Sequence, residues 1–403
     1  MSRSSDTTAA ADSAARTGAA PPFPHAMAAA MLFGLAIAWS GGIVGPVVNA
    51  ISAEFDVSLT EVGLLSGTVF FGGIGIAMLI AAPVSGRAGV TGAMRLACLL
   101  AMAGNAVMAL SPAFLGLCAG RLLTGIGLGL VFVLGPVFAR DVGGVRAMGL
   151  FGGFTSLGIA IALVTGSVLE DIGVDWRVGF GLAAVLPIIP LILIPRQVPG
   201  LTAAHEGWGF LGRAVRTPRV YLLAILFIAV LSIPLVMSAW IIYYLVADGM
   251  PHAVAGVFGF LLFLLAMIFR PLGGRLDAAG WSPATICLVG VTLGAAGLGA
   301  MALDRGLPYA IAAVLLMGIG YALPYAPLFD AGERVFPKTP VGSLSMFTFA
   351  ANISPMLLIP VVGAALEGAD GEFVLLMLAG FVMGAMLVNL SAPQLQSEKK
   401  SGG

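Results

Sequence analysis

Twelve apolar segments fill this chain from about residue 26 to residue 393, and they limit the possible folds more than any single motif does. Crossing the ~30 Å hydrocarbon core of a bilayer takes about 20 apolar residues, which is the length of most of these segments. Backbone groups that face lipid find no water to bond, so each span must be helical. We expect spans near residues 26–49, 61–83, 93–111, 113–138, 147–169, 177–195, 220–247, 253–275, 283–303, 307–329, 341–366 and 371–392.

Composition supports an all-α polytopic membrane protein. The chain is 59% hydrophobic and 9% charged, which excludes a water-soluble domain of this size. The three cysteines lie within expected spans and the three histidines lack ligand spacing, so we expect neither disulfides nor a metal site. There is no phosphate-binding glycine loop and no catalytic side-chain constellation. We therefore expect no enzyme activity, no cofactor and no nucleic-acid partner.

The basic residues predict the orientation in the membrane. If both termini are cytoplasmic, the cytoplasmic side holds nearly all of the 19 Lys and Arg residues. The opposite side holds only Arg177 and Arg305, and Arg121 lies inside a span. Positive charge in short loops marks the cytoplasmic face. The sequence thus predicts a multi-pass protein of the inner membrane with cytoplasmic termini, surrounded by lipid and acting as a monomer.

The longest internal polar stretch divides the chain into two six-helix halves, and the halves resemble a repeat. Leu123–Gly127 is echoed by Leu316–Gly320, and Gly135–Phe138 by Ala326–Phe329, at offsets of 193 and 191 residues. Fixed-offset similarity is the mark of a structural repeat. The expected parts are a disordered cytoplasmic tail at 1–25, a first half at 26–195, a linker at 196–219, a second half at 220–393 and a cytoplasmic tail at 394–403.

Two parallel-repeat halves are the layout of a secondary transporter, and the chain resembles the major facilitator superfamily along nearly its whole length. Arg121, Gly125 and Gly129 match the spacing of the family's R-x-x-x-G-x-x-x-G element in span 4. Asp175-Trp176-Arg177 before span 6 is another feature common in the family.

The loop between spans 8 and 9 is similar to the family's gating loop. Gly273, Asp277 and Gly280 have the family spacing, with Leu276 one place late. In the loop between spans 2 and 3 the matching copy keeps Arg87 and Gly89. That copy has Gly86 where the family has its acid. The resemblance implies that Arg87, Gly89, Gly273, Asp277 and Gly280 take part in gating.

Arg121 is the first candidate for a substrate contact, because a charged side chain inside the membrane is costly and usually faces a cavity or a partner. It lies about 12 Å into span 4 at 1.5 Å per residue. Two readings remain open: a contact for an anion or a proton relay, or a structural role in which it bonds backbone carbonyls, Asn49 or Asn352. No Asp or Glu lies near the middle of a span, so the membrane interior favours an anionic solute, or a neutral polar one, over a cation.

Arg270 is the second basic candidate. In the superfamily branches for small anions such as nitrate or cyanate, the resemblance places an anion-binding arginine in an R-P-x-G-G stretch, here Arg270–Gly274. Span 2 lacks the arginine that the nitrate branch also uses. The alternative is that Arg270, late in span 8, extends to the cytoplasmic interface.

Several polar residues complete the candidate site. Pro324 and Pro327 interrupt the hydrogen-bond ladder of span 10 beside Tyr321 and Tyr325, so we expect this helix to bend. Thr155 and Ser156 in span 5 bond a neighbouring helix more often than a substrate. The expected substrate-binding residues are Arg121, Arg270, Tyr321, Tyr325, Asn49 and Asn352.

The leading hypothesis is a secondary active transporter that moves a small organic or inorganic anion or weak acid by alternating access, with a proton as a candidate co-transported ion. One alternative is a proton-coupled exporter of drugs or amphipathic metabolites. Span 5 lacks the second glycine and the proline that are usual in drug antiporters of the superfamily. A non-transporting membrane receptor is the remaining alternative.

Overall fold

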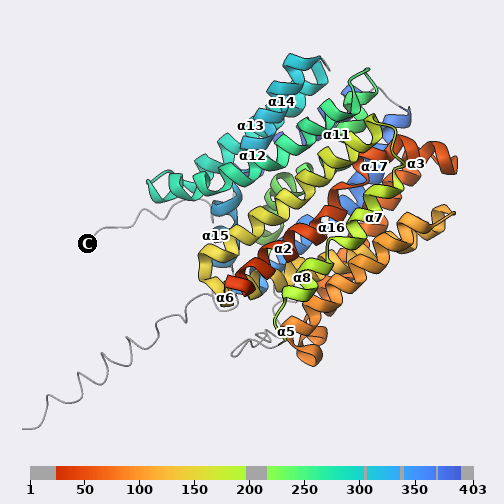
Figure 1. The fold of residues 1–403 in the computed structure, drawn as a ribbon. Helices are drawn as coiled ribbons and strands as arrows, with labels where there is room; N and C mark the ends of the chain where they lie inside the picture. The colour runs from red at the N-terminus through yellow and green to blue at the C-terminus, as the bar shows by residue number, and fades with distance from the viewer. Residues whose placement is uncertain (1–23, 197–215, 304–305, 336–339, 369–370, 392–403) are drawn as a thin grey trace, which may run out of the picture.

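The computed structural model is a bundle of long helices that run along one common axis (Figure 1). It describes residues 24–196, 216–303, 306–335, 340–368 and 371–391. The expected tails and the linker fall largely outside these residues. In Figure 1, α5 (Phe70–Leu110) lies at one edge of the bundle and α13 (Pro283–Leu303) and α14 (Leu307–Gly320) lie at the other.

The helices of the first half account for spans 1 to 6. They are α2 (Pro24–Gly42), the 3₁₀ turn η1 (Gly45–Val47), α3 (Val48–Phe55), α4 (Leu59–Gly63), the π-helical turn η2 (Leu64–Val69), α5, α6 (Phe114–Asp171), α7 (Arg177–Val185) and α8 (Ile188–Leu193).

The second half accounts for spans 7 to 12. Its helices are α10 (Pro218–Phe227), the π-helical turn η4 (Ile228–Ser232), α11 (Ile233–Val246), α12 (His252–Ala278), α13, α14, α15 (Tyr325–Val335), α16 (Pro340–Ile353), α17 (Pro355–Gly368) and α18 (Gly371–Ser391).

The expected number of spans agrees with these helices. In the described residues, nine helical segments are long and apolar enough to cross a membrane, and Arg177–Leu193 and Gly371–Ala385 are shorter apolar helices. The longest segment, Leu59–Leu110, has 52 residues and breaks at Gly89, where φ is 72° and ψ is 164°. It therefore holds spans 2 and 3, and each of the twelve expected spans coincides with one helix or with two or more consecutive helical segments.

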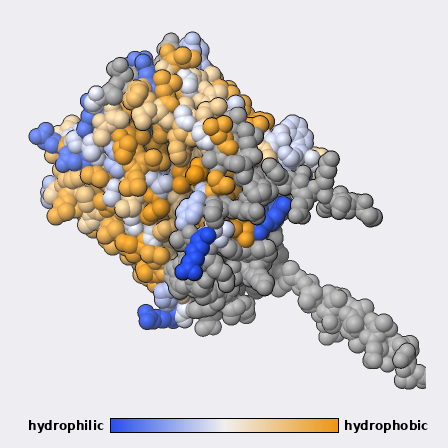
Figure 2. Space-filling model, turned by 180° about the vertical axis from the view of Figure 1, so that it is seen from behind, coloured by the Kyte–Doolittle hydropathy of each residue, from blue (hydrophilic) through white to orange (hydrophobic). Residues whose placement is uncertain are grey.

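Large hydrophobic side chains cover the outside of the bundle. Leu79 is 50% exposed, Ile192 75% and Leu357 67%. Figure 2 shows one face on which hydrophobic residues dominate the described surface. An apolar surface of this extent suits contact with acyl chains rather than water.

The helices of the bundle turn at two opposite ends, which we call the Glu54 end and the Arg87 end. The Glu54 end is where helices stop at Phe55, Leu110, Asp171, Val246 and Gly368. The Arg87 end is the opposite one, where the chain turns at Gly89, at Gly143 and Gly144, and after Ala278.

The turns repeat between the halves. After span 1 the chain turns at Asp56 with φ of 51°, and after span 7 it turns at Gly249 with φ of 88°. After span 2 it turns at Gly89, and after span 8 at Gly280 with φ of 92°. These pairs are separated by the same 193 and 191 residues as the sequence echoes. Backbone geometry thus supports the repeat, and the Asp56–Gly249 pair adds a position that the sequence comparison did not use.

The helices of spans 2 and 8 extend further into the gating stretches than expected. Residues 82–88 continue the helix of span 2, and residues 270–278 belong to α12. Both stretches are therefore the last turns of a helix, and each ends at a glycine with positive φ, which other residues adopt only with strain. The expected break in span 10 is confirmed, since α14 ends at Gly320 and α15 begins at Tyr325.

Gly273 lets α12 approach span 10 closely. A Cβ at this position would overlap the carbonyl oxygen of Leu323, which is backbone and cannot rotate away. At the neighbouring Gly274, a Cβ would meet only the Cβ of Ala326, at 3.5 Å, an ordinary contact.

We predict that Gly273→Ala lowers the unfolding free energy by about 1–3 kcal/mol, because the added methyl group forces two helices apart. Thermal unfolding in detergent measures the change, and Gly274→Ala is the matched control. Equal stability of the two variants would contradict the packing role assigned to Gly273.

Candidate functional site

Arg270 lies at the contact between the two halves. It is eight residues from the end of α12, which places it about 12 Å into the bundle from the Arg87 end at 1.5 Å per residue. The side chain is half-buried. Its Nη1 donates a hydrogen bond of 2.9 Å to Oγ of Ser156, on the span 5 part of α6. Arg270 therefore does not extend to the membrane interface, and that alternative reading is wrong.

Tyr325 provides the other side of this cluster. The guanidinium carbon of Arg270 lies 4.4 Å from the centroid of the Tyr325 ring, a cation–π contact. Tyr325 is the first residue of α15 and stacks on Phe329, with centroids 4.3 Å apart. The break in span 10 thus places an aromatic ring beneath the arginine. The structure brings together two of the expected substrate contacts, Arg270 and Tyr325, and joins them to Ser156.

One donor of this arginine is unused. Nε of Arg270 is buried and has no hydrogen-bond partner among the described residues. None of the ion pairs in the described part of the chain involves Arg270. A guanidinium carries five N–H donors and an obligatory positive charge, so this cluster can bind a further acceptor, above all an anionic one.

Span 5 has both close and open positions beside Ser156. A Cβ at Gly153 would meet Met267 of α12 at 3.1 Å, so spans 5 and 8 still touch at that level. Nearer the Arg87 end, a Cβ at Gly152 or at Gly149 would meet nothing within 4 Å. These two glycines lie on the same helix face as Ser156, since they precede it by four and seven residues. Gly152 and Gly149 therefore have open space beside them on the Arg87 side of Ser156.

Arg121 has a different environment. It is 1% exposed and donates a hydrogen bond of 2.5 Å from Nη1 to the carbonyl oxygen of Ser40 in span 1. Its guanidinium carbon lies 3.8 Å from the centroid of the Phe70 ring in span 2. Nε has no partner among the described residues. These contacts all belong to the first half, as the structural reading of Arg121 requires, although they come from Ser40 rather than from Asn49 or Asn352.

Asn105 extends this network. Its Nδ2 donates to Oγ of Ser40 at 2.8 Å and to the carbonyl of Ala101 at 2.8 Å. Asn105 and Ser40 are both fully buried. Spans 1, 3 and 4 are thereby joined around the backbone of residue 40, which holds the first half together as one unit.

The remaining expected substrate contacts lie apart from Arg270. Tyr321 is 3% exposed, and its ring fills the space beside Gly294 in span 9. Asn352 donates to Thr348 of its own helix at 2.8 Å, and Asn49 is exposed on α3. The structure does not gather these three residues with Arg270 into one site.

Of the expected gating residues, the three glycines shape the backbone, and the two charged residues have no ion-pair partner within the described ranges. Arg87 is exposed and Asp277 is half-buried. The ion pairs found there are Arg177 with Glu54, Arg177 with Asp175, and Arg334 with Asp330. A gating role for Arg87 and Asp277 stays a prediction.

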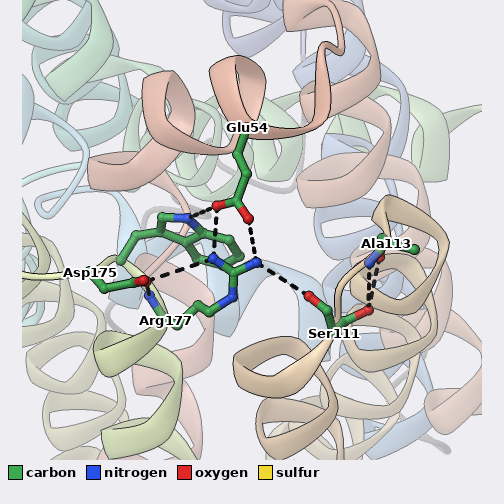
Figure 3. A network of polar contacts seen from close by, with 6 residues as sticks. Glu54, Ser111, Ala113, Asp175 and Arg177 are labelled. Carbon is green, nitrogen blue, oxygen red and sulfur yellow. Dashed lines mark hydrogen bonds and ion pairs between the residues drawn. The ribbon is translucent and has the colours of Figure 1, made fainter.

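A polar cluster at the Glu54 end was not expected from the sequence (Figure 3). Glu54, at the end of span 1, accepts hydrogen bonds from Nη1 and Nη2 of Arg177 at 2.8 and 2.5 Å. It also accepts one of 2.7 Å from the indole nitrogen of Trp176. Arg177 further donates to the carbonyl of Ser111 at 3.4 Å and lies 4.4 Å from the Trp176 ring centroid. Spans 1, 3 and 6 are thus tied together at this end.

We predict that Arg177→Ala lowers the unfolding free energy by about 1 kcal/mol, because a partly exposed but bidentate contact is lost. Melting of purified protein in detergent measures it. Arg275→Ala removes an exposed arginine that forms no ion pair within the described ranges. That control should melt like the wild type, and the prediction fails if both variants melt alike.

Metal binding has no support in the described ranges, where no group of three or more His, Cys, Asp or Glu side chains could hold an ion. The candidate site is therefore the Arg270–Ser156–Tyr325 cluster, a cationic position between two helical halves with open space on one side.

Comparison with known proteins shows the family. Residues 30–360 match the model of the Major Facilitator Superfamily. A probable polyol transporter from Arabidopsis thaliana is 30% identical over 165 residues, which are 38% of this chain and 31% of that relative. The matched segment thus spans about a third of the relative's length.

Solved structures share the fold at low sequence identity. A D-xylose–proton symporter has a TM-score of 0.72 at 14% identity, covering 94% of this chain and 99% of its own. A bacterial homolog of the human lysosomal transporter Spinster, inward-facing and unoccupied, has a TM-score of 0.73 at 16% identity, covering 95% and 100%.

None of these three relatives is named as an anion transporter, so the comparisons do not support the expected nearness to the nitrate and cyanate branches. The family model itself covers more than half of the chain. The protein therefore belongs to the Major Facilitator Superfamily and is a multi-pass membrane protein.

Proposed function

We propose that the protein moves a small organic anion or weak acid across the membrane by alternating access, with Arg270 as the contact for the acidic group. The observation that carries this proposal is the buried, unpartnered Nε of Arg270 at the contact between the halves. A cation inside the membrane needs a counter-charge or hydrogen-bond acceptors. A solute carboxylate can supply both, and a planar guanidinium matches it in shape.

Ser156 and Tyr325 hold the guanidinium in place. Ser156 occupies one N–H donor from the first half, and the Tyr325 ring supports the other face from the second half. An anion bound at Arg270 therefore interacts with a group attached to both halves. Binding at such a position can bias how the halves sit relative to each other.

The direction of opening follows from the contacts between the halves. Spans 2 and 11 meet at the Glu54 end, where a Cβ at Gly63 would lie 2.7 Å from Cα of Pro360. Open space lies instead beside Gly149 and Gly152 toward the Arg87 end. We assign the Arg87 end to the cytoplasmic side of the inner membrane, because the basic residues gather there. In this assignment the structure is the inward-facing state, and both termini are cytoplasmic.

A neutral sugar or polyol is the second candidate substrate. It is favoured by the polyol transporter from Arabidopsis thaliana and by the D-xylose–proton symporter among the structural neighbours. Hydroxyl groups of a polyol could bond Arg270, Ser156 and the phenol of Tyr325. Few other polar side chains are free to recognise hydroxyl groups nearby, since Thr155 bonds its own helix at Phe151 and Asn352 bonds its own at Thr348. We therefore rank the polyol below the organic anion.

Coupling to a proton belongs to the same proposal. The symporter of similar fold is named for proton coupling. The membrane interior of this chain has no carboxylate near the middle of an expected span, so a proton would travel more readily on the weak acid itself than on a buried Asp or Glu.

We predict that Arg270→Gln lowers the uptake of benzoate into proteoliposomes by about 10- to 100-fold at sub-saturating concentration, the loss expected for a charge-assisted hydrogen bond. Radiolabelled benzoate, nitrate, xylitol and D-xylose form the panel, measured with and without an imposed pH gradient. Arg275→Gln is the control, because this exposed arginine lies five residues further along the same chain.

Saturable benzoate or nitrate uptake that depends on Arg270 supports the proposal. Saturable xylitol or D-xylose uptake without any anion uptake would replace it with the polyol function. Anion uptake that survives Arg270→Gln would show that the contact lies elsewhere.

A further inference from the structure

Thr60 and Glu367 connect the two halves at the Glu54 end. The backbone N–H of Thr60 in span 2 donates to Oε1 of Glu367 in span 11 at 2.9 Å. The Thr60 hydroxyl donates to Oε2 of the same carboxylate at 2.8 Å. The two residues are 307 positions apart in the chain. One carboxylate of the second half thus accepts two hydrogen bonds from a single residue of the first.

The local structure of span 2 explains why Thr60 needs an outside acceptor. Ser58 caps the helix, its hydroxyl accepting from the N–H of Glu61 while the Glu61 carboxylate accepts from the N–H of Ser58. The N–H of Thr60 has no carbonyl acceptor within its own helix, because the first turn of any helix leaves its donors free. Glu367 fills this gap, and its negative charge is favourable beside the positive end of the helix dipole.

The backbones are close enough to make this contact part of a seal. A Cβ at Gly67 would lie 2.8 Å from Cδ of Pro360, and one at Gly363 would lie 2.6 Å from the carbonyl oxygen of Leu59. Eight residues along span 2 from Thr60, the Thr68 hydroxyl donates to the carbonyl of Met356 at 2.8 Å. Small residues let spans 2 and 11 pack without intervening side chains. These contacts would all have to be broken for the Glu54 end to open.

We propose that the Glu367 carboxylate is a latch that holds the Glu54 end closed, and that its release from Thr60 accompanies opening at that end. The proposal rests on alternating access as the proposed function. It does not depend on which solute is carried. In contrast to the apolar contacts around Gly63 and Gly67, the Glu367 side chain is exposed to water and Thr60 is half-buried. The latch can therefore exchange its hydrogen bonds for water at modest cost and re-form them in every transport cycle.

The test measures the distance between the halves at the Glu54 end. Spin labels are placed at Ile172→Cys and Leu303→Cys, two side chains that are 66% and 78% exposed at the same end on opposite halves. The native cysteines Cys98, Cys118 and Cys287 are first replaced by Ala. Double electron–electron resonance, measured without substrate, then gives the populations with short and long distances between the two labels.

Glu367→Ala is expected to raise the population with the long separation by about three- to tenfold, as for a partly exposed charge-assisted contact. Thr60→Val is expected to raise it by a smaller factor, because the backbone N–H of residue 60 still donates to Glu367. The double variant should match Glu367→Ala, because Thr60→Val removes only the hydroxyl donor, whereas Glu367→Ala removes the acceptor of both hydrogen bonds. Glu372→Ala is the matched control, since Glu372 is an exposed carboxylate at the start of α18 on the same half.

Unchanged populations in Glu367→Ala, or an equal change in Glu372→Ala, would overturn the latch. Thr60→Val keeps the shape of the residue, so it tests the contact even if Glu367→Ala folds poorly. Failure of the proposed function is distinguishable, because it appears as absent uptake in the wild type and leaves these distances unaffected.

Discussion

A guanidinium inside a membrane must receive its hydrogen-bonding partners from the protein, and the two intramembrane arginines of this chain meet that constraint in opposite ways. Arg121 is enclosed by Ser40 and Phe70, which both belong to the first half. Arg270 is held by Ser156 of the first half and Tyr325 of the second. Hydrogen bonds within one half make that half rigid, whereas the environment of an arginine held by both halves changes when the halves move. Arg270 is therefore the better place for a bound solute to influence their arrangement.

Rigid halves are the condition for such a mechanism. In the first half, the Ser40–Asn105–Arg121 network lies in the interior, and the Glu54–Arg177–Trp176 cluster lies at one end. Together they tie spans 1, 3, 4 and 6. Contacts between the halves have a different character, because they rely on glycines that allow close approach and on a few exposed or part-buried hydrogen bonds. Strong contacts within halves and weaker ones between them favour movement of whole halves over local unfolding.

Much of the fold could be predicted from the sequence, because lipid imposes helices and the length of a span. The repeat could also be predicted, because two halves with the same fold need the same spacing between equivalent residues. The equal turns at Asp56 and Gly249, and at Gly89 and Gly280, have this spacing. Helix ends were less predictable. Spans 2 and 8 were expected to end at residues 83 and 275, yet both continue as helix to the turn that holds a glycine with positive φ, Gly89 or Gly280.

The partners of polar groups could not be predicted. Glu54 and Arg177 are 123 residues apart, and Thr60 and Glu367 are 307 apart. Their local sequence does not identify the hydrogen-bond partner, because helix packing determines which helix ends lie together. Arg270 illustrates the same limit: its position late in span 8 suggested the membrane interface, and only the neighbouring helices place Ser156 and Tyr325 around it.

The most direct test of a solute acting through Arg270 is the separation of the halves at the Arg87 end as anion is added. Spin labels at Gly149→Cys and Ala278→Cys, on spans 5 and 8, report it in proteoliposomes titrated with benzoate. If Arg270 couples binding to the halves, benzoate shifts the distance distribution in the wild-type background and leaves it unchanged in Arg270→Gln. The same shift in both backgrounds, or a shift with xylitol alone, would contradict the role assigned to Arg270.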